Sequence, residues 1–128
     1  MKGTGDRENG SIAVIACGLV ALAVVLTVAV VAVGGAVVLA GRAEAAADSA
    51  ALAAADTVAL GRSSWACGAA SLVAELDGAH LVACRVEPQA VEVVVELTGA
   101  GAAALGRTVR ARSRAVVDFS ASRGGAGE

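Results

Sequence analysis

The sequence predicts an α+β membrane protein: a long N-terminal transmembrane helix continues outside the membrane, and a short helix and a small antiparallel sheet follow it. Three observations support this fold class. Residues 12–40 contain no charged side chain, and residues 42–60 are rich in alanine and lack both proline and glycine. Beyond residue 80 the hydrophobic period changes from that of a helix to the two-residue period of a strand. With 128 residues, the chain has room for one small domain besides the helix.

The first element is the apolar run at 11–41, which is longer than the roughly 20 residues that cross the hydrocarbon of a bilayer. It is also about twice as long as the apolar part of a cleaved secretory signal. Lys2 and Arg7 precede the run, and only Arg42 follows it closely. This small excess of positive charge predicts a cytoplasmic N-terminus and a C-terminal domain outside the cell membrane.

The second element is the alanine-rich stretch, which continues the helix to about residue 60 because Gly41 weakens a helix without ending it. Its small side chains recur at steps of three and four residues, which predicts a smooth face for packing against another helix. This predicted assembly face consists of Ala46, Ala50, Ala53 and Ala54. The alternative is a spacer helix with no partner.

The remaining elements form a small outer domain. We expect a helix that is capped by Ser63 or Ser64 and ends before Asp77 and Gly78. Strands are expected at 81–87, 90–98 and 108–119, with a hairpin at Pro88 and a loop or short helical turn at 99–106. The predicted organisation is a cytoplasmic tail at 1–10, the transmembrane helix at 11–41, its extension at 42–61, the outer domain at 62–119 and a flexible tail at 120–128.

The predicted second and third strands carry complementary charges on one face. Glu92 and Glu96 alternate with apolar residues in one strand, and a row of arginines alternates with small residues in the next, at Arg110, Arg112 and Arg114. Neighbouring strands would place these charges opposite one another as cross-strand pairs on a solvated face. The row could instead be a binding surface for a partner.

Two cysteines fall in the outer domain. In an oxidising compartment, Cys67 and Cys84 could form a disulfide that closes a loop of about 17 residues, which would stabilise a small core by about 3 kcal/mol. Two buried thiols are the alternative. Cys17 lies within the apolar run and is expected to be a small buried hydrophobic residue.

No active site is expected from the residue types present. The chain has one histidine and no Cys-x-x-Cys pattern, so neither a metal centre nor a cofactor site is predicted. A nucleophile at Ser63, Ser64 or Ser71 would have to recruit His80 and Asp77, which are simply the polar residues of that neighbourhood. A net charge of -2 argues against nucleic acid as a partner. A non-enzymatic protein is therefore expected.

The order of these parts resembles the TadE/TadG-like proteins of Flp (tight adherence) pilus systems. The residues that carry the resemblance are the Glu-Asn-Gly-Ser entry at 8–11 and the alanine box at 46–55, which includes Asp48, Ala50, Ala51 and Leu52. The later cysteine and the valine-rich strand resemble the short actinobacterial type found near secretion genes. The likeness extends over about residues 5 to 118.

The resemblance implies a minor pilin-like or assembly component of a Tad pilus or secretion apparatus, whose partners are the membrane and other pilin-like subunits. It also implies a candidate processing site between Gly10 and Ser11. Pilins of this class usually carry a glutamate five residues after the processed glycine, whereas this chain has Ile15. A fibre subunit and a permanent membrane anchor both remain open, and the alternative function is a membrane-tethered binding module.

Overall fold

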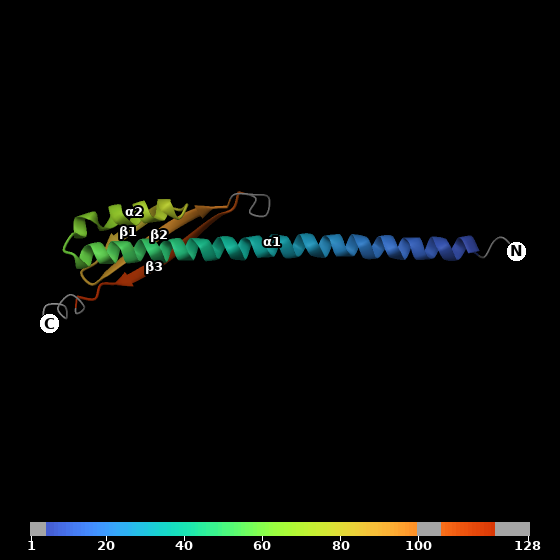
Figure 1. Cartoon of the computed structure of the whole chain (residues 1–128), viewed down its shortest axis with the longest axis horizontal. Helices are drawn as coiled ribbons and strands as arrows, with labels where there is room; N and C mark the ends of the chain where they lie inside the picture. The colour runs from blue at the N-terminus through green and yellow to red at the C-terminus, as the bar shows by residue number, and fades with distance from the viewer. Residues whose placement is uncertain (1–4, 100–105, 120–128) are drawn as a thin grey trace. The chain divides into compact units, whose positions relative to one another are not determined.

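The computed structural model describes residues 5–99 and 106–119, and these contain two helices, a short 3₁₀ turn and a three-stranded sheet (Figure 1). The flexible tail expected at 120–128, most of the loop expected at 99–106 and the first four residues of the expected cytoplasmic tail lie outside the described residues. The chain divides into two compact units, Met1–Gly35 and Ala36–Glu128. The predicted α+β class is confirmed.

Helix α1 is continuous from Gly5 to Ala59, so it begins six residues earlier than expected and ends within one residue of the expected position. Gly61, with φ of 76°, ends the helix. The amide of Gly61 donates to the carbonyl of Val58, and the amide of Arg62 donates to the carbonyl of Thr57. This pair of bonds is a Schellman motif, which needs the left-handed backbone that glycine adopts without steric cost.

Helix α2, Ala66–Leu76, follows a 3₁₀ turn at Ser63–Trp65. The predicted serine cap is wrong, because Trp65 occupies the N-cap position and no side chain caps the helix. The C-terminal end is as expected: Gly78 has φ of 77°, and the amide of Ala79 donates to the carbonyl of Ala74 in a second Schellman motif.

The sheet has the order β1-β2-β3, with both pairs antiparallel. The strands are β1 at His80–Val86, β2 at Ala90–Thr98 and β3 at Thr108–Val116, so all three predicted strands are present with small shifts at their ends. The β1–β2 hairpin turns at Pro88 as predicted, and the amide of Glu87 donates to the carbonyl of Ala90. A register irregularity between Leu81 and Ala83 interrupts the pairing of β1 with β2.

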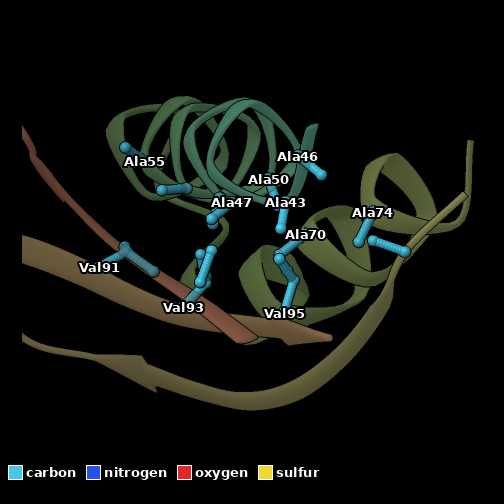
Figure 2. Close-up of a cluster of buried hydrophobic side chains, with 14 of the residues drawn as sticks. Ala43, Ala46, Ala47, Ala50, Ala55, Ala70, Ala74, Val91, Val93 and Val95 are labelled. Carbon is cyan, nitrogen blue, oxygen red and sulfur yellow. The ribbon is translucent and has the colours of Figure 1, made fainter. Parts of the chain in front are cut away.

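The core of the second unit lies between the helices and one face of the sheet. Figure 2 shows alanines of α1 and α2 facing Val91, Val93 and Val95 of β2. These three valines are the largest fully buried side chains, and no polar side chain among the described residues is buried. Because alanine projects only one methyl group, the helices can approach the valine surface closely, and a core with almost no aromatic residues is still filled.

Candidate functional site

The N-terminal part of α1 is exposed on all sides. Every residue from 10 to 34 is exposed, and residues 12–34 carry no charge. At 1.5 Å per residue, these 23 residues extend over about 35 Å, close to the roughly 30 Å of hydrocarbon in a bilayer. Helix α1 is long and apolar enough to cross a membrane, and it is the one such helix in the part of the chain that the structure describes.

The second half of α1 has a different environment from residue 36 onward. Leu39 is buried, and buried residues then recur at steps of three and four along one face. That face consists of Leu39, Ala43, Ala46, Ala47, Ala50, Ala51, Ala54, Ala55 and Val58. The part of α1 from residue 36 to Ala59 thus contributes one face to the core of the second unit.

This packing corrects the assignment of the predicted assembly face. Ala46 is 2% exposed, and Ala50 and Ala54 are 0% exposed, while Ala53 is half-buried beside them. Ala46, Ala50 and Ala54 belong to the same buried cluster as the valines of β2 and the alanines of α2, and Figure 2 shows Ala46 and Ala50 within it. This face of α1 is therefore covered by the chain itself and is not free to pack against another helix.

The disulfide between Cys67 and Cys84 joins α2 to β1, with an S–S distance of 2.03 Å. This disulfide agrees with the predicted pairing, and it links α2 to β1, an edge strand of the sheet. Cys17 is a free thiol on the uncovered part of α1, where its side chain is exposed rather than buried by protein.

The arginine row forms the cross-strand pairs that the charge pattern predicts. Arg110 lies 2.7 Å from Glu96, and Arg112 lies 3.6 Å from Glu92. Arg114 reaches past its register partner and pairs with Glu87 at 2.8 Å. The outer face of the sheet is therefore a solvated surface whose charges pair within the chain.

The serines considered for catalysis lie at different places in the fold, with Ser71 inside α2. Ser63 and Ser64 lie before α2, and His80 lies beyond its other end, so the 11 residues of that helix separate them. Asp77 instead accepts a hydrogen bond from the hydroxyl of Ser49. Within the described ranges, no group of three or more metal-binding side chains occurs. An open cavity of about 330 Å³ lies beside Thr57, Arg62 and Trp65.

One feature of α2 was missed by the sequence reasoning. Its outward side carries three large apolar residues, Trp65, Leu72 and Leu76, which are 72%, 61% and 78% exposed. We call these three residues the α2 stripe. Their spacing of seven and four residues places them on one face of a helix, but spacing alone does not show whether that face is buried or exposed.

A long helix with an uncovered apolar segment and a disulfide-bonded α+β unit after it are consistent with the class of single-span membrane proteins. Within this class, residues 10–57 match the family model of the TadE/G-like Flp pilus-assembly proteins. The matched segment includes the uncovered part of α1 and most of its buried alanine face. No curated protein and no solved structure matches the chain. The family match supports a role in pilus assembly.

Proposed function

We propose that this chain is a non-enzymatic, membrane-anchored component of a Tad/Flp-type pilus or secretion apparatus. The observation that carries the proposal is the match of residues 10–57 to the pilus-assembly family. The alternative of a tethered binding module has less support, because Arg110, Arg112 and Arg114 each pair with a glutamate of the same chain.

The component acts by helix packing, and α1 offers a surface for it within the membrane. The alanine face of α1 is occupied by the chain's own sheet and α2, whereas the segment at 10–34 is exposed on every side and offers an apolar surface to a partner helix. Gly18 and Gly34 have no heavy atom of the chain within 4 Å of a Cβ placed on them, so these positions leave space where a second helix can approach closely.

The second unit lies on the outer side of the membrane, and the N-terminus is cytoplasmic. The disulfide between Cys67 and Cys84 supports this orientation, because such bonds persist in oxidising compartments and are rare in the cytosol. A membrane-impermeant protease added to intact cells should therefore degrade this unit and leave residues 1–10 attached to the span.

The test is to remove the chain from its own host cell and count surface fibres by electron microscopy. We expect fibres to be lost and to return with the wild-type chain. A matched variant keeps residues 36–128 but replaces residues 12–34 with an unrelated apolar helix of equal length. This variant should stay in the membrane and fail to restore fibres. Normal fibres after removal would refute the assembly role, and full restoration by the replaced span would refute packing through that helix.

Intact mass of the membrane-bound protein separates the two modes of action. A permanent anchor keeps the residues before Ser11, whereas a fibre subunit processed after Gly10 begins at Ser11. Because Ile15 stands where pilins of this class usually carry a glutamate, we propose the permanent anchor, and a mass that begins at Ser11 would contradict it.

A further inference from the structure

The polarity of α2 is inverted for a helix on the surface of a domain. Its buried side consists of Ala66, Ala70 and Ala74, which are all 0% exposed, while the α2 stripe faces solvent. A helix on the surface of a soluble domain normally buries its large apolar side chains and exposes its polar ones. An exposed apolar strip of this kind marks an interaction surface.

Acidic side chains are also exposed on the helices. We call the segment at 36–78 the helical layer, which consists of α1 from Ala36 onward, α2 and the residues that join and directly follow them. In the described segment at 36–78, five exposed carboxylates belong to this layer: Glu44, Asp48, Asp56, Glu75 and Asp77. Exposed arginines in the same segment are Arg42 and Arg62. The helical layer therefore presents an apolar strip and has more exposed carboxylates than exposed arginines.

The outer face of the sheet carries arginine side chains as its most exposed charged groups. The side chains of Arg110, Arg112 and Arg114 are 67%, 70% and 55% exposed, whereas those of their glutamate partners are only 23–34% exposed. Arg85 of β1 is also exposed and lies opposite Glu92 in the register. The guanidinium groups therefore form the outermost layer of this face, although each of the three pairs is neutral as a whole.

The two charged faces lie on opposite sides of the domain. The valines of β2 point to the helices, and successive side chains of a strand point to opposite faces of its sheet. Glu92, Glu96 and the arginines consequently point away from the helical layer. One copy thus carries complementary surfaces on its two sides.

We propose that copies of this chain associate in one direction, with the α2 stripe of one copy seated on the arginine-bearing sheet face of the next. Charge complementarity selects this arrangement, because contact between two helical layers would bring their carboxylates together. The guanidinium groups and their apolar stems can cover Trp65 of the neighbouring copy. Since the two contacting surfaces differ, each added copy leaves a free surface of each kind, and a row can grow.

This inference rests on the proposed structural role and adds the surface by which copies meet. It is tested by cysteine crosslinking of the full-length protein in phosphatidylcholine vesicles, in a Cys17→Ser background. The Leu72→Cys and Arg112→Cys changes are made singly and together, and products are separated on a non-reducing gel after mild oxidation. The double variant should give a ladder of dimers, trimers and larger species, and a mixture of the two single variants should give dimers. A control pairs Leu72→Cys with Ser64→Cys, which is exposed but not on the sheet, and should give no ladder.

A second variant, Leu72→Asp, should prevent association of the copies while the domain stays folded. Leu72 is 61% exposed, so the change should leave thermal unfolding unaltered. Because Leu72 cannot carry both changes, the crosslink is then placed at Leu76→Cys and Arg112→Cys, and Leu72→Asp should reduce that ladder at least tenfold. The reverse combination, Leu76→Asp with the crosslink at Leu72→Cys and Arg112→Cys, should have the same effect. Efficient dimers from Leu72→Cys alone, or no ladder from the double variant, would overturn the proposed arrangement. Either result would refute this surface but not the assembly role, which is tested by loss of fibres when the chain is removed. Conversely, a ladder together with normal fibres after removal would refute only the assembly role.

Discussion

The disulfide between Cys67 and Cys84 should supply a large part of the stability of the second unit. The bond closes a loop with a sequence separation of 17. The chain-entropy relation assigns a loop of this length about 3 kcal/mol. For a unit of roughly 80 ordered residues, the unfolding entropy near the midpoint converts this free energy into a fall in Tm of roughly 15 °C.

The assay is thermal unfolding of the full-length protein in detergent micelles, followed by the fluorescence of Trp65, the one tryptophan of the chain. Wild type, reduced wild type and the double variant Cys67→Ser/Cys84→Ser are compared. Reduction and double substitution should lower Tm by the same amount, and the oxidised wild type should migrate faster than the variant on a non-reducing gel. A Tm change below about 3 °C in both would refute the entropic argument and would favour two independent thiols.

Three further predictions concern the packing and the surface. Ala50→Leu should lower the free energy of unfolding by about 1–3 kcal/mol in denaturant titrations because its site is filled, whereas Ala45→Leu on the exposed side should change it by less than about 0.5 kcal/mol. Gly78→Ala should lower the free energy of unfolding by about 1 kcal/mol because φ is 77°, although the site has space for a methyl group. Gly68→Ala, within α2, should raise the free energy of unfolding by a similar amount, and effects of the same sign at the two sites would contradict this reasoning. Arg112→Ala should cost less than about 1 kcal/mol, since its ion pair is long and its side chain is 70% exposed, and a larger loss would show that the pair is more than a surface contact.

The secondary structure was predictable because each signal was local. Gly61 and Gly78 end the two helices through their left-handed backbone, and the alternation of valine with glutamate defines β2. The end of β3 was less predictable: the strand stops at Val116, and the amide of Val117 donates to the carbonyl of Gln89 in the β1–β2 turn. That contact is tertiary, so the alternation of residues could not reveal it.

The use of the alanine face could not be predicted from its spacing. A smooth face at steps of three and four residues suits packing against any close surface, whether a second helix or a valine-covered sheet. The decisive fact is that β2 directs Val91, Val93 and Val95 toward α1. The arginine row was easier to interpret, because Glu92 and Glu96 stand opposite it once β2 and β3 pair in register.

The central claim is that α1 changes role near residue 36, from a membrane span to the core helix of an outer domain. The most direct measurement is labelling of single cysteines in intact cells with a membrane-impermeant maleimide, in a Cys17→Ser background. Ala45→Cys, on the exposed side of the covered half, should label from outside, and Val25→Cys, in the uncovered half, should label only after the membrane is dissolved in detergent. Ready labelling of Val25→Cys in intact cells, or no labelling of Ala45→Cys, would contradict the account.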